Sequence, residues 1–335
     1  MAKTWQDNPP ADSCVRQLTF APHGHVLTNA NVWSPDGEWI VYDVRPDAAG
    51  SMFEGERIEM VHVATGEVRV LYESCDGARC GVATFNPASS EVVFIRGPKR
   101  PTEDWSYNAW HREGIVVRTD EPSVGRHLDA RDVVPPFTPG ALRGGTHVHM
   151  FSADGAWVSF TYEDHVLATF DPSTQSLHVD RNQRNVGVSV PARSVTVPKS
   201  HPRNHDGSHF SVLVTRTCNS PRPGSDGIQR AFEEAWVGRD GYRRPDGTRQ
   251  LRALAFQGEV ITQDGHLISE VFIVDIPGDV TQRGDTPLQG TLTSRPAPPR
   301  GTLQRRLTFT ADRRHPGIQG PRHWPRSSPD GGRNA

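Results

Sequence analysis

The sequence predicts an all-β protein with the fold of a β-propeller, and three observations support this prediction. The turn Ser34-Pro35-Asp36-Gly37 lies between two apolar runs. Weaker copies of this hairpin recur at roughly 50-residue spacing, as in propellers and arrays. Glycine (31) and proline (28) are frequent, and no segment keeps a helical period. The copies centre on Asn86-Pro87-Ala88, Ala153-Asp154-Gly155, Asp206-Gly207 and Pro329-Asp330-Gly331.

The chemistry of this turn explains why its copies predict stacked sheets. Proline presets φ, aspartate hydrogen-bonds its own backbone, and glycine adopts positive φ without strain. Two apolar runs beside such a turn form an antiparallel hairpin. One hairpin cannot bury both faces alone, so the copies must pack on one another.

Bulk composition narrows the possible partners. A formal net charge of −2 over 335 residues gives no electrostatic basis for binding nucleic acid or an anionic membrane. No apolar run is long enough to cross a bilayer. Residues 1–10 lack the apolar region of a secretory signal, so we expect a cytoplasmic protein. Cys75 and Cys80 have no second matching pair and are interpreted as ordinary thiols.

The first predicted strand, residues 15–20, has a near twin in Arg305–Phe309. Each ends in Leu-Thr-Phe and precedes a Ser-Pro-Asp-Gly hairpin, which suits the outer strand of one blade leading into the next. The 15–20 segment is therefore predicted as the outer strand of the blade that closes the ring. The first complete blade is then predicted from strands at 30–34, 39–44, 57–63 and 67–72.

Later blades follow from the same alternation of apolar runs and turns. The segments 216–230 and 278–301 are rich in Pro, Gly and Arg and are predicted as loops or insertions. The second blade is predicted at 82–86, 91–96 and 114–118, and the third at 146–152, 157–162, 165–170 and 176–180. The fourth is predicted at 195–201, 210–215 and 234–237, and the fifth at 251–256, 260–262 and 269–276.

These assignments treat residues 1–335 as a single propeller domain with four-stranded blades. Six blade starts are visible, the last between Ile318 and Ser327. A seven-bladed ring of four-stranded blades is the expected complete form. The chain stops at Ala335, soon after Asp330-Gly331, so the last blades are expected to be incomplete after residue 331.

The Trp33–Gly37 hairpin and the Arg16–Phe20 segment resemble TolB-like β-propellers. Within that group the chain looks most like an uncharacterised bacterial family of the YidR type, which is similar to oligogalacturonate lyases. That resemblance implies a divalent metal held by histidines and a glutamine at the central channel, and β-elimination on uronate sugars. His147-Val148-His149 looks like the His-x-His element of those enzymes, although their preceding glutamine is absent from Arg143–Thr146.

Fifteen histidines make their placement informative. When the turns are aligned, Asn29 and Asn31 of the first copy correspond to His147 and His149 of the third. Inner strands of a propeller converge on one axis, so these positions are expected to line the channel. His205 and His209 fall on a turn and a second strand and are weaker candidates.

Two more histidines align with the same positions. His201 corresponds to His149, and His323 corresponds to His147. Neutral imidazoles suit a divalent transition metal such as Mn or Zn. Gln319 and His315, on the segment entering the last blade, would complete the shell. The alternative is that the histidines line a wet channel and hydrogen-bond one another through water.

The connection 97–112 carries Trp105, Tyr107 and Trp110 beside His111. Two interpretations are open for it, a contact for carbohydrate or peptide and a loop folded back onto the blade edge.

Two functions therefore follow from the sequence. The first is a metal-dependent lyase acting on uronate oligosaccharides, in which the metal polarises a substrate carboxylate. The second is a non-catalytic propeller that binds a protein or a small ligand at the channel mouth. No residue is assigned as the catalytic base.

Overall fold

The computed structural model describes residues 15–28, 30–47, 52–171, 179–318 and 327–332. The fold is all-β: in these ranges the helical segments are the 3₁₀ turn η1 (Ala109–His111) and the single-turn helix α1 (His165–Ala168). No helix in the described ranges is both long and apolar enough to cross a bilayer.

Four antiparallel four-stranded sheets follow one another along the chain, and within each the spatial order is the chain order. Sheet one contains β1 (Gly24–Val26), β2 (Trp39–Arg45), β3 (Arg57–His62) and β4 (Val68–Glu73). Sheet two contains β5 (Cys80–Phe85), β6 (Glu91–Arg96), β7 (Glu113–Arg118) and β8 (Glu121–His127). Sheet three contains β11 (Gly144–Phe151), β12 (Val158–Asp164), β13 (Asn185–Val190) and β14 (Phe210–Leu213). Sheet four contains β15 (Ile228–Trp236), β18 (Ala253–Ile261), β19 (Leu267–Asp275) and β20 (Leu303–Arg306).

Two small pairs complete the described strands. Parallel β9 (Ala130–Arg131) and β10 (Ala141–Leu142) lie between sheets two and three in the chain. The hairpin of β16 (Tyr242–Arg243) and β17 (Arg249–Gln250) is inserted in sheet four.

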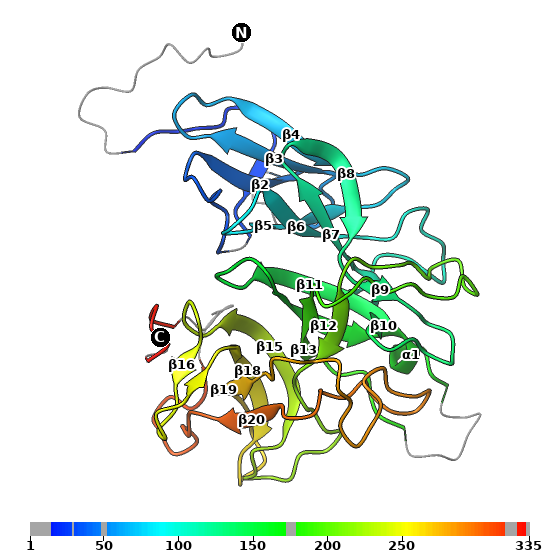
Figure 1. The fold of residues 1–335 in the computed structure, drawn as a ribbon, viewed down its shortest axis with the longest axis vertical. Helices are drawn as coiled ribbons and strands as arrows, with labels where there is room; N and C mark the ends of the chain where they lie inside the picture. The colour runs from blue at the N-terminus through cyan, green and yellow to red at the C-terminus, as the bar shows by residue number, and fades with distance from the viewer. Residues whose placement is uncertain (1–14, 29, 48–51, 172–178, 319–326, 333–335) are drawn as a thin grey trace.

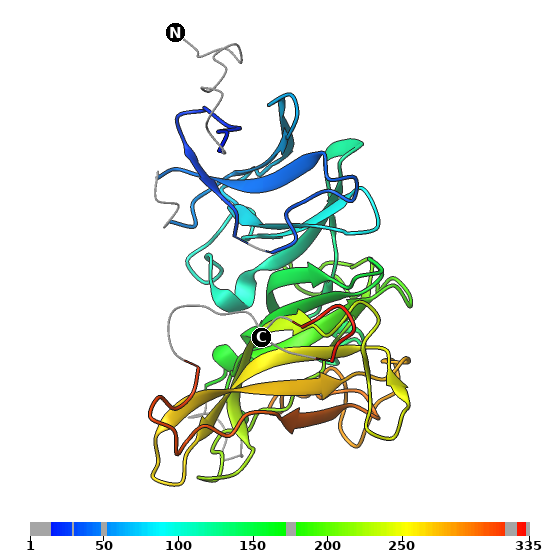
Figure 2. The same cartoon turned by 90° about the vertical axis from the view of Figure 1, so that its left-hand side faces the viewer.

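Each sheet packs against the next one in the chain. One apolar core joins sheets one and two, a smaller one joins sheets two and three, and the largest joins sheets three and four. Sheets one and two form the upper half in Figure 1 and sheets three and four the lower half. Figure 2 shows the same division after a quarter turn, with residues 327–332 beside sheet four.

The predicted hairpin turns of the first and third copies are confirmed, whereas Gly207 of the Asp206-Gly207 copy bridges to Val195 and is not at positive φ. The Asp36 carboxylate accepts the Glu38 amide proton at 2.9 Å, and Gly37 has φ of 73°. In the third copy, Asp154 accepts from the Ala156 amide at 3.2 Å, and Gly155 has φ of 71°. These turns therefore use the side-chain and glycine chemistry that the sequence predicts.

A β-bulge interrupts the first strand of sheets two, three and four at equivalent places. Each bulge has a non-glycine residue at positive φ: Val82 (62°), Val148 (55°) and Glu233 (52°). A bulge re-aims the side chains that follow it. The next residues, Ala83, His149 and Glu234, are buried as a result.

The predicted strands of the first two sheets largely agree with the structure, with one exception at the start. Sheet one begins at β1, and the predicted strand 30–34 contributes the isolated bridge of Trp33 with Ile40. Residues 15–20 form no strand, so the prediction of an outer strand there is wrong. Its twin is confirmed in part, because β20 is the outer strand of sheet four.

The blade boundaries beyond residue 164 were predicted wrongly. Residues 165–168 form α1 because Asp164 caps the turn by accepting the Leu167 amide proton. Residues 172–178, which include part of the predicted strand 176–180, lie outside the described residues.

The predicted fourth and fifth blades are also rearranged. Segment 210–215 supplies β14, the last strand of sheet three, and 195–201 contributes the bridge of Val195 with Gly207. Strand β15 begins inside the predicted loop 216–230, and β18 joins segments predicted as two strands. The described residues thus contain four complete four-stranded sheets where the sequence predicted more blade starts.

Candidate metal centre

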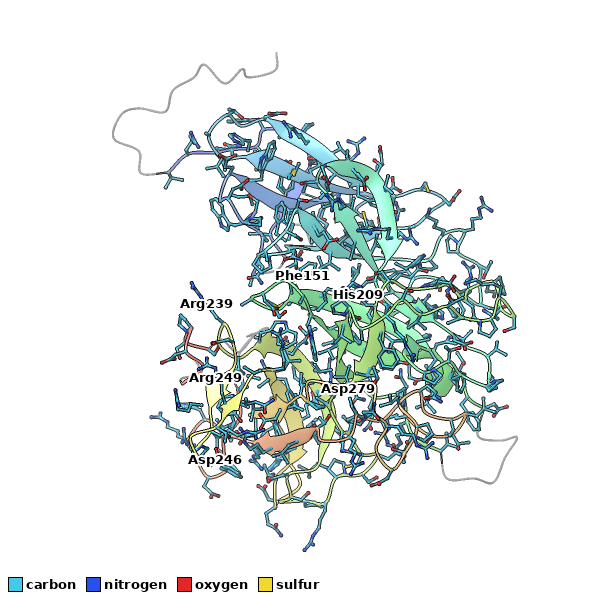
Figure 3. All side chains as sticks on the ribbon, in the orientation of Figure 1. Phe151, His209, Arg239, Asp246, Arg249 and Asp279 are labelled. Atoms are coloured by element: carbon cyan, nitrogen blue, oxygen red, sulfur yellow. The ribbon has the colours of Figure 1, made fainter. Side chains whose placement is uncertain are left out.

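A cluster of three metal-ligand side chains lies where sheet two meets sheet three. Glu113, His127 and His205 each bring one ligand atom within 4.8 Å of the others. Of the residues that the structure describes, these three form the one group of this kind. Figure 3 labels His209, close to His205 in the chain, near the boundary between the two halves of the molecule.

Backbone pairing brings the three residues together. Glu113 is the first residue of β7 and His127 the last of β8. The connection between β13 and β14 reaches across and pairs with β9: the Arg131 amide donates to the His205 carbonyl at 2.9 Å, and the reverse bond is 3.1 Å. The imidazoles of His127 and His205 then stack, with centroids 3.7 Å apart and planes 20° apart.

Two buried arginines hold the carboxylate of Glu113. Arg96 Nη2 donates to Oε2 at 2.6 Å, and Arg131 Nη1 donates to Oε1 at 3.4 Å. Burial by itself would raise the pKa of Glu113, but His205, Arg131, His127 and Arg96 outweigh burial and lower the pKa to about 2. The carboxylate is therefore charged at neutral pH.

Arg131 also organises the surrounding backbone. Its side chain is completely buried. Its guanidinium donates to the carbonyl oxygens of His111 (3.3 Å), Arg112 (2.5 Å) and Gly144 (3.3 Å). One side chain thereby fixes the end of the 97–112 connection against the start of β11.

The two imidazoles are neutral at pH 7. Burial lowers the pKa of His127 to about 4, with Arg96 and Arg131 acting in the same direction and Glu113 opposing them. Burial, followed by His127, lowers the pKa of His205 well below its usual value. Neutral imidazoles with an ionised carboxylate are the protonation states that transition-metal coordination requires.

Nitrogen atoms of both rings have no hydrogen-bond partner among the described residues: Nδ1 of His127 and Nε2 of His205. Nδ1 of His127 lies 3.9 Å from Oε2 of Glu113. Stacked rings aim their lone pairs nearly parallel, so coordination of a single ion requires one ring to turn. Coordination through Nδ1 of His127 also places its proton on Nε2, which lies 3.4 Å from Arg96 Nη2, and these two groups must then separate.

A second histidine pair lies beside the centre. His111 Nδ1 lies 2.8 Å from the Ser106 carbonyl, so this nitrogen carries the proton. His111 Nε2 then accepts from His165 Nδ1 at 3.0 Å. These two bonds leave His165 Nε2 unprotonated. Burial lowers the pKa of both, to about 4 and about 3, so both rings are neutral.

The connection 97–112 packs back onto the pair of His111 and His165. Trp105 is 5% exposed and stacks on His111 with centroids 3.9 Å apart. Tyr107 stacks on Phe53 at 5.0 Å. Of the two interpretations of the 97–112 connection, the folded-back loop is the one that the structure confirms.

The predicted metal ligands occupy different surroundings. His149 is fully buried, and a Cβ placed on Gly114 would lie 2.7 Å from both His149 Nε2 and Asp129 Oδ1. His147, two residues earlier, is partly exposed. His201 packs instead near Trp105, with ring centroids 5.6 Å apart.

The remaining predicted residues are dispersed or lie outside the described ranges. His315 is exposed, and Asn31 lines a cavity to which β11 and β15 also contribute. Asn29, Gln319 and His323 lie outside the described residues. Within the described ranges, His147, His149, His201 and His315 belong to no group with three ligand atoms in mutual reach.

Comparison with known proteins places the chain in a family. Its sequence is 48% identical over 324 residues to the uncharacterized protein YidR of Escherichia coli (strain K12), and the alignment covers 96% of this chain and 72% of that protein. The chain belongs to the YidR family. A family model described as "Protein of unknown function (DUF3748)" matches residues 79–205.

The matched segment of this YidR-family chain coincides with the candidate centre. It contains Glu113, His127 and His205, together with Arg96 and Arg131. It also contains the His111 and His165 pair. Sequence reasoning missed Glu113 and His127 because neither lies in a repeated turn, and the backbone pairing of His205 with Arg131 leaves no signal in residue spacing.

Proposed function

We propose that this YidR-family protein is a TolB-like β-propeller that holds one divalent transition metal at Glu113, His127 and His205. In this proposal it carries out β-elimination on uronate oligosaccharides. The observation that carries the proposal is the cluster of one ionised carboxylate and two neutral imidazoles with ligand atoms within 4.8 Å of one another.

Repetition of one sheet type supports the propeller arrangement. Four successive meanders of four strands, each packed on the next, are the unit from which propellers are built. First-strand residues or the turns that follow them come together around one cavity: Asn31 from sheet one, Pro87 from sheet two, Phe151 from sheet three and Trp236 from sheet four.

The donor set fits a Mn or Zn ion. Two imidazoles and one carboxylate are a common ligand set for catalytic zinc, and they leave further positions for substrate or water. A bound ion would act as a Lewis acid that polarises a substrate carboxylate. The nitrogens without partners on His127 and His205 are the atoms available to hold it.

The charges around the centre favour an anionic substrate. Arg96 and Arg131 are both paired with Glu113, and Asp129 is a second carboxyl group that interacts with Arg131. Arg203 also lies close, held by hydrogen bonds to the carbonyls of Lys99 (2.7 Å) and Arg100 (3.0 Å). The guanidinium of Arg203 is the positive charge that would attract a polyanion such as an oligouronate.

Metal content of the purified protein tests this proposal. After incubation with Mn or Zn and desalting, elemental analysis should find about one equivalent in the wild type. His205→Ala should lose it. His209→Ala, a substitution in the same segment outside the cluster, should retain it. Release of unsaturated uronate from oligogalacturonides, followed by absorbance, should track the metal.

Two results would contradict the proposal. Absence of bound metal in the wild type removes the centre, and equal metal content in His205→Ala shows that the ion binds elsewhere. Full metal occupancy without uronate cleavage leaves the metal site in place and rejects the lyase.

The second candidate function is a non-catalytic scaffold that binds a protein. The observation in its favour is the outer edge of sheet four, where the side chains of Leu303 and Phe309 are 55% and 64% exposed. An unpaired edge with apolar side chains is a template for strand addition by a partner. This function predicts a protein without bound metal or lyase activity.

A further inference from the structure

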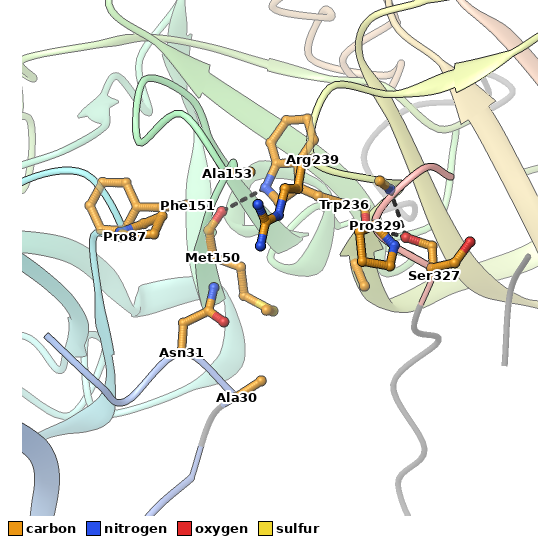
Figure 4. Close-up of a pocket in the computed structure, with 13 residues that line it drawn as sticks. Ala30, Asn31, Pro87, Met150, Phe151, Ala153, Trp236, Arg239, Ser327 and Pro329 are labelled. Carbon is orange, nitrogen blue, oxygen red and sulfur yellow. Dashed lines mark hydrogen bonds between the residues drawn. The ribbon is translucent and has the colours of Figure 1, made fainter. Parts of the chain in front are cut away.

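A cavity of about 500 Å³ lies between β11, β15, the segment that follows β1 and the turn that follows β5. Its size is within the range of pockets that bind small molecules. Figure 4 shows the side chains around it. The lining residues from the strands and turns include Asn31, Pro87, Met150, Phe151, Trp236 and Pro329.

Polar and apolar groups contribute about equally to the walls of this cavity, and the walls are tied together across sheets. Met150, Phe151 and Trp236 supply apolar surface from β11 and β15. Trp236 Nε1 donates to the Met150 carbonyl at 2.9 Å, which fixes the indole against sheet three. A fixed aromatic side chain beside a thioether suits a flat apolar group.

One positive charge faces the cavity. The Arg239 side chain extends over the cavity in Figure 4, and among the described residues no carboxylate pairs with its guanidinium. Its backbone is anchored, because the Arg239 amide donates to the Pro329 carbonyl at 2.9 Å.

The Ser327 hydroxyl at the cavity wall is already engaged. Ser327 Oγ accepts from the Gly238 amide at 2.6 Å and donates to the Trp236 carbonyl at 3.3 Å. The guanidinium of Arg239 is therefore the charged group at this wall that remains for an anion. Its planar fork matches a carboxylate or sulfonate.

We propose that this cavity binds a small amphipathic anion, with its carboxylate or sulfonate on Arg239 and its apolar body between Met150, Phe151 and Trp236. This site is separate from the metal centre, because none of Glu113, His127 and His205 lines the cavity. Its existence does not depend on the proposed lyase.

Two fluorescent probes test the proposal. 8-Anilino-1-naphthalenesulfonate has the required shape and charge, and N-phenyl-1-naphthylamine is nearly the same molecule without the sulfonate. Both should bind the wild type. Arg239→Ala should weaken sulfonate binding by about tenfold or more, the loss of a charge-assisted hydrogen bond, and leave the neutral probe unchanged.

Two further variants complete the design. Arg243→Ala removes an exposed guanidinium of the neighbouring hairpin, outside the cavity, and should bind both probes like the wild type. Ala153→Trp places a large side chain at an exposed lining position and should reduce binding of both probes. Near-ultraviolet circular dichroism checks that each variant is folded.

The proposal is overturned if Arg239→Ala leaves sulfonate affinity unchanged, or if Ala153→Trp leaves both probes bound as before. Equal weakening of both probes by Arg239→Ala also rejects the assigned role of the charge. Metal content should be the same in all of these variants, so failure here and failure of the metal centre are distinguishable.

Discussion

The imidazoles of His127 and His205 stack at 3.7 Å, although one ends a strand of sheet two and the other lies in a connection of sheet three. Neither sheet contains the cluster alone. The candidate centre is therefore assembled only when the two sheets dock, and its properties should follow the stability of that interface.

Glu113→Gln should be strongly destabilising. The substitution removes the negative charge between Arg96 and Arg131, whose side chains are 8% and 0% exposed. Leaving buried charges without a counter-ion costs about 3–5 kcal/mol. Urea denaturation should show this loss in the free energy of unfolding. Glu73→Gln is the control, because its pair with Arg57 is about half exposed and should contribute at most about 1 kcal/mol. Similar losses in the two variants would contradict the prediction.

Asp43→Ala should destabilise the packing of sheet one against sheet two. The Asp43 carboxylate is fully buried and accepts from the amides of Val82 (2.6 Å) and Ala83 (3.0 Å) at the bulge of β5. It also pairs with buried Arg45 at 2.8 Å. We expect a loss of about 3–5 kcal/mol, since two amides and a guanidinium lose their acceptor. Thermal unfolding measures it, with Asp120→Ala, an exposed partner of Arg118, as the near-neutral comparison.

Gly155→Ala should cost more than Gly37→Ala. Both glycines occupy the same turn with nearly the same φ, 71° and 73°. A Cβ on Gly37 meets nothing within 4 Å, but a Cβ on Gly155 would lie 2.1 Å from Oδ1 of Asn86. Strain at positive φ costs about 1 kcal/mol in both turns, and Gly155→Ala adds displacement of Asn86, which donates to the Gly155 carbonyl. Equal urea midpoints for Gly155→Ala and Gly37→Ala would show that the contact of the Gly155 turn with Asn86 does not affect stability.

Glu234 should make the stability of the protein fall as pH rises. Burial raises its pKa to about 8 from the usual 4.5. Between these pKa values the unfolded chain releases the proton and the folded chain retains it, so stability decreases from about pH 4.5 to pH 8. Glu234→Gln should remove this part of the slope and stabilise the protein at pH 8. Exposed Glu67→Gln should leave the slope unchanged, and a slope retained in Glu234→Gln would refute the assignment.

The elements that the sequence predicted well are those whose turns carry their own signal. Asp36 and Asp154 hydrogen-bond neighbouring amides, so the flanking strands can be placed from local chemistry alone. Beyond residue 164 the signal weakens. The alternation of Val195 and Val197 predicts a strand, but their side chains are buried in the core between sheets three and four without a ladder.

The candidate centre was less predictable than the fold. His205 was predicted only as a weaker candidate ligand, because its backbone pairing with Arg131 is a tertiary contact that leaves no periodicity. The carboxylate of Glu113 is held in place by Arg96 and Arg131. These two arginines lie on different strands. Alignment of the repeated turns identified histidines on equivalent strands, whereas the cluster forms from non-equivalent segments.

The guanidinium of Arg131 donates to three carbonyl groups, two in the connection before β7 and one at the start of β11. Its N–H donors are directed at the carbonyl oxygens of His111, Arg112 and Gly144. Chimeras between members of this family should therefore exchange residues 79–205 as an undivided block, because a crossover inside it would leave Arg131 facing foreign main chain.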